Sequence, residues 1–206
     1  MKMSKTLFLF GAGHGGENPD NGQYVTAGKR SPKHNGKTLL FEGINNRINV
    51  KLIIEGMKQS GLDAVDIVND WRDISLNERA RRVNEIAKSR QCVYIDIHSD
   101  GMGNGREWHS ASGIGVYKYI FSSSKSDFLA KYLRQELTCN FTGISKDRGI
   151  RKKNFHSLRE TSCPACLLEL GFHTNLEETK LMLSDDWRNR VVKSIVDACS
   201  IYEMNH

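Results

Sequence analysis

Short apolar runs alternate with longer amphipathic segments along this chain, and the alternation limits the folds that it can adopt. Runs typical of buried strands occupy residues 5–12, 63–69, 92–97, 115–121 and 165–170. Segments with helical spacing of apolar residues occupy 42–60, 75–87, 124–140, 175–183 and 185–203. Because such alternation is typical of parallel sheets with both faces covered, we predict an α/β, three-layer fold with a mostly parallel sheet and helices on both faces.

Three stretches do not fit the alternation. Residues 13–39 are polar and rich in Gly, Asn and Lys, which predicts a long loop with a functional role. Residues 148–153 form a basic run, which is most often a solvated loop and is otherwise a contact for an anionic ligand. Residues 154–159 are weakly strand-like. No internal repeat or linker is visible, so the 206 residues are expected to form one domain.

The formal net charge of +6 favours an anionic partner. Nucleic acid, a membrane surface and an acidic cell-wall polymer all meet this condition. Aromatic residues suited to stacking on single-stranded nucleic acid are sparse near the basic run, where Phe155 stands alone. The longest apolar runs, at 6–12 and 112–121, are far shorter than the roughly 18 residues needed to cross a bilayer. We therefore expect no nucleic-acid partner and no transmembrane segment.

The first ten residues combine a basic start with an apolar stretch, as a signal peptide does, but the stretch is short and runs directly into glycines. We interpret it as the first strand and expect synthesis in the cytoplasm without a signal peptide. The chain has five cysteines, and Cys92, Cys139 and Cys199 lie within apolar patterns. This indicates buried free thiols of a reducing compartment.

Four polar residues lie where the chemistry of an α/β fold is usually found. His14 follows the apolar run that ends at Phe10, and His98 follows the run 92–97, so both imidazoles are expected beyond the carboxyl ends of strands. Glu42 begins an amphipathic helix, and Glu169 is a carboxylate inside an otherwise apolar strand, where an unpaired charge is costly. Two histidines and a carboxylate can hold a hydrolytic Zn²⁺, with a second carboxylate as base.

Two further motifs have simpler explanations. Gly11-x-Gly13-x-x-Gly16 matches the dinucleotide-binding fingerprint, but no helix opens at Gly16 because residues 17–22 are turn-forming. Cys163-Pro-Ala-Cys166 has the spacing of a redox pair or half a zinc site, yet a strand follows it and a second cysteine pair is missing, so ordinary packing is favoured. The histidines interpreted as surface or hydrogen-bonded residues are His34, His109, His156 and His173.

An ordered set of motifs, spread over nearly the whole chain, resembles the zinc-dependent N-acetylmuramoyl-L-alanine amidases, which are peptidoglycan hydrolases of bacteria and phage lysins. The set consists of Gly13-His-Gly-Gly16, Thr26 to Pro32 with Glu42, Leu76-x-x-Arg79 through Asn84, Ile95-Asp-Ile-His-Ser99, and Leu158-Arg159 through Asn175. The ordered set is specific, although its individual pieces are not.

By this resemblance His14, Glu42 and His98 would be Zn²⁺ ligands and Glu169 the catalytic carboxylate. The implied reaction is hydrolysis of the amide bond between N-acetylmuramic acid and L-alanine in peptidoglycan, with Glu169 taking a proton from water and returning it to the leaving amine. Residues 1–206 would be a single amidase catalytic domain with no separate wall-binding domain. Two departures affect the surroundings of the metal: Gly11 replaces a usual acidic residue and Asp100 a usual Asn.

Peptidoglycan is the partner that the resemblance implies, and an anionic cell-wall polymer is a second candidate because of the positive charge. A lysin that reaches the bacterial wall after release through a permeabilised membrane fits best, while phage or bacterial origin, host and oligomeric state stay open. Another zinc amidohydrolase or peptidase is one alternative, and a catalytically silent wall-binding protein is another. Glu169 disfavours the second alternative. We also expect residues 17–39 and 148–153 to flank the site and to hold an anionic glycopeptide.

Overall fold

Six strands form the central sheet of the computed structural model, which describes residues 4–206. In their order across the sheet the strands are β4 (Ala64–Asp66), β1 (Leu7–Ala12), β5 (Cys92–Asp100), β8 (Ala165–Phe172), β6 (Ile114–Tyr119) and β7 (Asp147–Lys153). The first four run parallel, whereas β6 pairs antiparallel with β8 and parallel with β7. The mostly parallel sheet is thus confirmed, and β6 and β7 begin at the edge where β1, β5 and β8 end.

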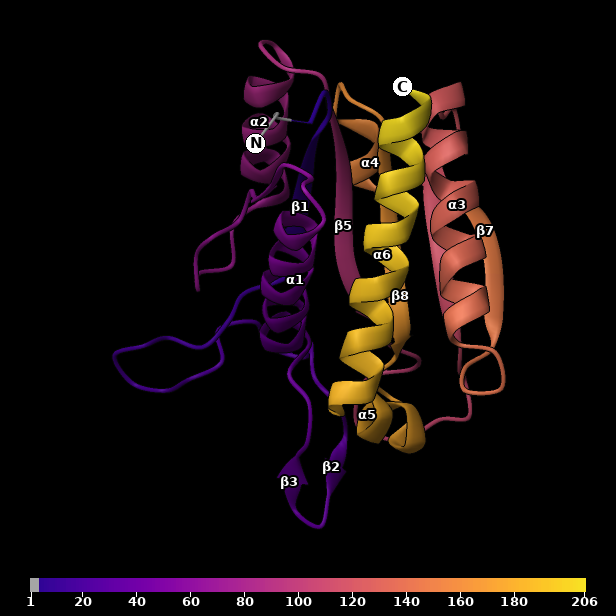
Figure 1. Ribbon diagram of the computed structural model, residues 1–206. Helices are drawn as coiled ribbons and strands as arrows, with labels where there is room; N and C mark the ends of the chain where they lie inside the picture. Colours follow the sequence, from indigo (N-terminus) through magenta and orange to yellow (C-terminus); the bar gives the residue numbers. More distant parts are fainter. Residues whose placement is uncertain (1–3) are drawn as a thin grey trace.

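Helices cover both faces of the sheet (Figure 1). One face carries three long helices, α1 (Glu42–Gln59), α3 (Ser124–Asn140) and α6 (Asp185–Asn205), with α6 packed between the other two. The other face carries α2 (Leu76–Ala87) and the short α4 (His156–Arg159), while α5 (Leu176–Met182) follows β8. A small hairpin, β2 (Lys33–His34) and β3 (Lys37–Thr38), lies within the long loop and extends beyond the sheet edge. The predicted three-layer α/β fold is confirmed.

Alternate strand residues fill two apolar layers. Phe8, Val93 and Leu168 belong to the larger layer, under α1, α3 and α6. Leu9 and Tyr94 belong to the smaller layer, which includes residues of α2 and α4. Because both faces of the central strands are buried, their sequences are nearly continuous apolar runs.

Two elements differ from the expectation. The basic run, expected as a solvated loop, is part of the edge strand β7, in which Ile150 packs on the core while Arg151 and its two successors are exposed. An edge strand with one apolar contact carries little hydrophobic pattern. Residues 156–159 form a helical turn instead of the expected strand, and this turn buries Leu158 in the smaller layer.

Local details bear on the remaining expectations. Ser75 caps α2, since its Oγ accepts a hydrogen bond from Glu78 N at 3.2 Å, and Leu76, the next residue, is 51% exposed. All five cysteines are free; Cys166 packs in the larger layer and Cys163 against the smaller one, whereas Cys139 is exposed rather than buried. Among residues 4–206, no helix has the length and apolar character required to cross a membrane.

Candidate metal centre

Three side chains meet beyond the carboxyl ends of β1 and β5. His14 follows β1, His98 lies near the end of β5, and Glu42 is the first residue of α1. The Gly13 N–H donates to the Ile97 carbonyl at 2.9 Å, which keeps the chain beside β5. A Cβ at Gly13 would lie only 2.2 Å from His98 Cε1. The glycine at this position therefore makes room for a histidine ring.

Glu42 contacts the two histidines through different carboxylate oxygens. Its Oε2 lies 3.4 Å from His14 Nε2, and its Oε1 lies 3.2 Å from His98 Nδ1. One potential ligand atom from each of the three residues lies within 4.8 Å of the other two. The three residues selected from the sequence thus form one cluster.

The carboxylate of Glu42 gives the cluster a negative charge that can bind a cation. Burial opposes the charge of Glu42, but its interactions with His14 and His98 outweigh this effect and hold the pKa of Glu42 well below its ordinary range. Glu42 Oε2 is buried and has no hydrogen-bond partner among residues 4–206. An unpartnered buried carboxylate oxygen is costly, and a metal ion between two imidazoles and this carboxylate would satisfy it. The donor set of two nitrogens and one oxygen fits Zn²⁺.

Asp96, in the same strand as His98, supplies the acidic neighbour that Gly11 of β1 does not. It lies in β5 opposite Gly11 of β1, and its Oδ2 is 3.4 Å from His98 Nε2. Burial lowers the pKa of His98, but Asp96 and Glu42 outweigh this effect and raise that pKa well above its ordinary value. A Cβ at Gly11 would lie 2.2 Å from the Tyr94 hydroxyl and 2.7 Å from Asp96 Oδ1, so a larger residue at that position would displace both side chains. Asp96 of β5 is therefore the carboxylate that lies against the second ring nitrogen of His98.

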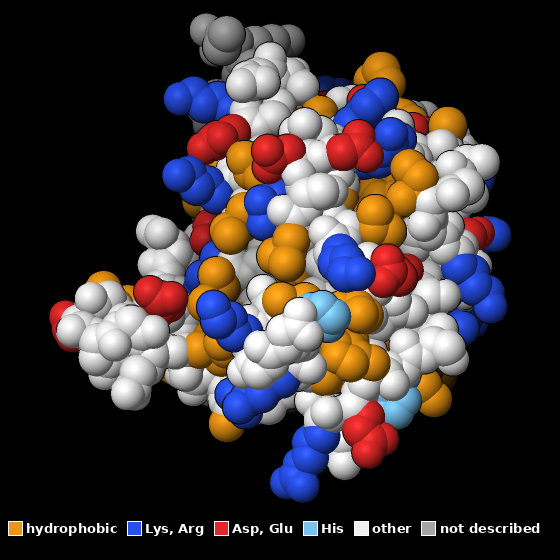
Figure 2. Space-filling model, turned by 90° about the horizontal axis from the view of Figure 1, so that it is seen from below, with side chains coloured by type: hydrophobic (Ala, Val, Ile, Leu, Met, Phe, Trp, Pro, Cys, Tyr) orange, Lys and Arg blue, Asp and Glu red, His pale blue; other side chains and the backbone are white. Residues whose placement is uncertain are grey.

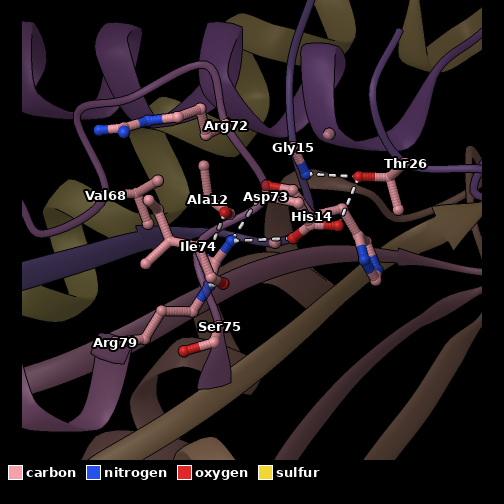
Figure 3. Close-up of polar contacts among 12 residues, drawn as sticks. Ala12, His14, Gly15, Thr26, Val68, Arg72, Asp73, Ile74, Ser75 and Arg79 are labelled. Atoms are coloured by element: carbon pink, nitrogen blue, oxygen red, sulfur yellow. Dashed lines mark hydrogen bonds and ion pairs between the residues drawn. The ribbon is translucent and has the colours of Figure 1, made fainter. Parts of the chain in front are cut away.

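Arg79 of α2 holds the backbone of His14 (Figure 3). Its buried guanidinium donates from Nη1 to Ala12 O at 2.6 Å, from Nη2 to His14 O at 3.0 Å and from Nε to Ile74 O at 2.9 Å. His14 has a φ of 65°, in the left-handed region that costs a residue other than glycine about 1–2 kcal/mol. Such strain persists where the surroundings fix the backbone, and Arg79 does so here.

Thr26 attaches the long loop to the same place (Figure 3). Its Oγ1 accepts a hydrogen bond from Gly15 N at 2.8 Å and donates one to Asp73 Oδ2 at 2.6 Å. Asp73 Oδ1 in turn lies 4.0 Å from Arg79 Nη2. The loop that carries Thr26 and the turn that carries His14 are therefore fixed to each other.

Glu169 stands beside the cluster, on β8. Its backbone is in register with His98 in β5 and with Gly115 in β6, and its side chain lines the same cavity as the cluster. Glu169 Oε2 is buried without a hydrogen-bond partner among the described residues. Burial raises the pKa of Glu169 to about 8, and the charge of His98 partly opposes this increase. The structure thus brings the fourth selected residue next to the other three.

His173 also belongs to this site. Its Nδ1 lies 3.1 Å from both the hydroxyl and the carbonyl oxygen of Ser99, and 3.8 Å from Glu42 Oε2. The expected hydrogen-bonded role is confirmed, but its place beside the cluster is absent from the sequence-based predictions. The signal that reveals it is its position directly after Phe172, the last residue of β8, at the same sheet edge as Glu169.

A cavity of about 250 Å³ lies over these residues. Lys29 of the long loop lines it, and a neighbouring cavity is lined by Arg148 and Arg151 of the basic run, whereas Lys152 and Lys153 line neither. Viewed toward this edge, Lys and Arg side chains are spread over the face (Figure 2). The long loop therefore reaches the site, and the basic run reaches the cavity beside it.

A His–Glu–His cluster beside a buried carboxylate, at the carboxyl edge of an α/β sheet, is typical of metal-dependent hydrolases. The family model described as N-acetylmuramoyl-L-alanine amidase matches residues 10–200. The chain belongs to this family, and it is a hydrolase of the N-acetylmuramoyl-L-alanine amidase class.

Similar proteins include enzymes with the same family description. The chain is 27% identical to the catalytic domain of CwlV, an N-acetylmuramoyl-L-alanine amidase from Bacillus (Paenibacillus) polymyxa var. colistinus, with a TM-score of 0.72 over 96% of this chain and 97% of that one. It is 26% identical to an N-acetylmuramoyl-L-alanine amidase from Clostridium difficile 630, with a TM-score of 0.77 over 97% of each chain. It is 33% identical over 110 residues to the Staphylococcus aureus protein named "Probable cell wall amidase LytH". The aligned segment covers 53% of this chain and 35% of that protein.

Proposed function

We propose that this chain is a zinc-dependent enzyme that acts on the bacterial cell wall and hydrolyses the amide bond between N-acetylmuramic acid and L-alanine of the stem peptide. The observation that carries the proposal is the convergence of His14, Glu42 and His98 within 4.8 Å, next to the buried carboxylate of Glu169. We assign the three clustered residues to Zn²⁺ and Glu169 to proton transfer.

Zn²⁺ in such a site supplies a Lewis acid that makes water more acidic and polarises an amide carbonyl. Asp96 Oδ2 lies 3.4 Å from His98 Nε2 and would keep a ring proton on that nitrogen, so that Nδ1 is the atom that binds metal. Glu169 accepts the proton of the attacking water and later delivers it to the nitrogen of the leaving L-alanine. Its raised pKa suits the second transfer, because a carboxyl that titrates near neutral pH can both take and give a proton.

Two alternative functions are distinguished by the bond that is cleaved and by the presence of Glu169. A different zinc amidohydrolase or peptidase would use the same ligands on another amide, so the bond that is cleaved distinguishes it. A silent wall-binding protein would bind peptidoglycan without Glu169. The carboxylate of Glu169 argues against this alternative, since its burial beside a metal cluster is costly and serves no purpose in binding alone.

Zymography on purified sacculi of several types tests the proposal. The wild type is expected to clear the sacculi, to lose this activity with a strong chelator and to regain it with Zn²⁺. Sedimentation with sacculi is the matched measurement of binding. Binding without clearing would support the silent binder, and clearing that is indifferent to chelation would overturn the zinc assignment.

A further inference from the structure

A second cavity, of about 570 Å³, adjoins the metal cluster. It shares Asp100, Gly101 and Met102 with the cavity over the cluster. Its far wall is the beginning of β7, which lies at this edge because β6 and β7 run opposite to β8. A substrate whose scissile bond lies at the cluster can therefore extend one arm into this second cavity.

The charges around the second cavity do not cancel. Asp100 is paired with Arg148 at 2.8 Å, and Asp147 is paired with Arg134 at 2.8 Å. Lys146 and Arg151 are exposed and have no ion pair within 4.0 Å among residues 4–206. Both acidic side chains are thus already neutralised, and two basic side chains are left for an anionic ligand.

Arg148 forms a fixed wall of the cavity. Its guanidinium lies over the ring of Phe172 at 4.5 Å and donates from Nη2 to Asp100 Oδ2 and to Tyr117 OH, both at 2.8 Å. The side chain is 10% exposed, and its Nη1 has no hydrogen-bond partner among the described residues. A guanidinium held on several sides loses little freedom when an anion approaches, so the wall is preorganised.

The chemistry of the cavity selects one arm of the substrate. The glycan arm carries neutral N-acetylated sugars, because the lactyl carboxyl of the muramic acid is part of the scissile amide. The peptide arm carries free carboxylates. Phe172, Ala111 and Met102 add apolar surface, which suits a peptide backbone with small side chains.

We propose that the second cavity binds a carboxylate of the stem peptide through Lys146 and Arg151, and so sets the direction in which the substrate lies across the metal cluster. This inference rests on the function proposed above. In this proposal the peptide arm is recognised by its charge, and Lys146 and Arg151 are the residues that recognise it.

The test compares two soluble substrates and two matched double variants. The substrates are a disaccharide linked to the dipeptide L-alanine–D-glutamic acid and the same compound with both carboxyls amidated. The variants are Lys146→Gln with Arg151→Gln, at the cavity, and Lys152→Gln with Lys153→Gln, which remove the same charge outside it. Unfolding temperature and zinc content establish that each variant is folded and loaded.

The cavity variant is expected to raise KM for the acidic substrate by about tenfold, the effect of losing two exposed charge contacts, with kcat within about twofold. KM for the amidated substrate should stay constant, and the control variant should resemble the wild type on both substrates. A cavity variant that still prefers the acidic substrate as the wild type does would overturn the proposal.

Three further outcomes are distinguishable. If glycerol phosphate oligomers inhibit cleavage of the amidated substrate by the wild type but not by the cavity variant, the site takes a wall-polymer phosphate and the peptide assignment is wrong. If the wild type cleaves neither substrate nor sacculi, the proposed function itself fails. If the wild type cleaves both substrates equally, the carboxylate site is refuted and the proposed function is not.

Discussion

Replacement of Glu169 by Gln separates its proposed proton transfer from metal binding. Gln keeps the size and hydrogen bonding of the side chain but cannot accept a proton, so turnover should fall by on the order of 100-fold or more. Glu169 is not one of the three clustered residues, so about one Zn²⁺ per chain should be retained. Elemental analysis measures the metal, and peptide release from sacculi measures the turnover.

The same substitution should change how the stability of the metal-free protein depends on pH. Burial raises the pKa of Glu169 from an ordinary value of 4.5 to about 8, so between these values the folded chain keeps a proton that the unfolded chain has lost. The stability of the wild type therefore decreases as pH rises from 4.5 to 8, and the Gln variant lacks this decrease. The full pKa shift from 4.5 to about 8 corresponds to about 5 kcal/mol. We expect about 2–3 kcal/mol, because the Oε2 atom of Glu169 is buried but the residue as a whole is partly exposed and solvent screens its charge.

Urea unfolding of the chelator-stripped proteins at pH 4.5 and pH 8.5 measures this effect. The Glu169→Gln variant should match the wild type at the lower pH and exceed it by about 2–3 kcal/mol at the higher pH. Glu55→Gln, an exposed change on α1, is the control and should have no such effect. Parallel pH dependence in wild type and Glu169→Gln would refute the argument from burial. Loss of zinc in Glu169→Gln would make Glu169 a ligand and reopen the role of Glu42.

Substitutions at three other residues test the cluster and its support. His98→Ala and Glu42→Ala should each weaken Zn²⁺ binding by roughly a hundredfold or more, measured by competition with a chelator, because each removes one of three ligands; unchanged affinity in either would remove that residue from the site. Arg79→Met should lower the free energy of unfolding by about 3 kcal/mol and weaken Zn²⁺ binding by about tenfold, since one buried and two partly buried carbonyl groups lose their donor and the strained backbone of His14 loses its restraint. Arg79→Lys should restore part of the metal affinity, and an Arg79→Met protein with wild-type affinity would reduce Arg79 to a purely structural role.

The architecture follows from the sequence because the central strands are buried on both faces and the helices carry regular apolar spacing. β7 is different, since an edge strand needs few apolar residues and its charges face solvent. The turn at 156–159 is too short for periodicity to distinguish a helix from a strand. Both of these errors fall where packing on neighbouring elements, and not local pattern, decides the conformation.

The site is visible in the sequence where a polar residue interrupts an apolar strand or follows it in a glycine-rich turn, as His14, His98 and Glu169 do. The supporting residues are harder to find. Asp96 acts because β1 and β5 pair in a register that places it opposite Gly11, and Arg79 acts through carbonyl groups of residues far along the chain. Such contacts between strands and helices require the three-dimensional arrangement.

We propose that Zn²⁺ in this chain directs hydrolysis to one amide bond of peptidoglycan. Mass spectrometry of the fragments that the zinc-loaded protein releases from purified sacculi tests this role. We expect glycan strands with free lactyl carboxyl groups and stem peptides that begin with an unblocked L-alanine, and both products should be lost on chelation and regained with Zn²⁺. Fragments cut within the stem peptide or the glycan, or the same products in the presence of a strong chelator, would contradict it.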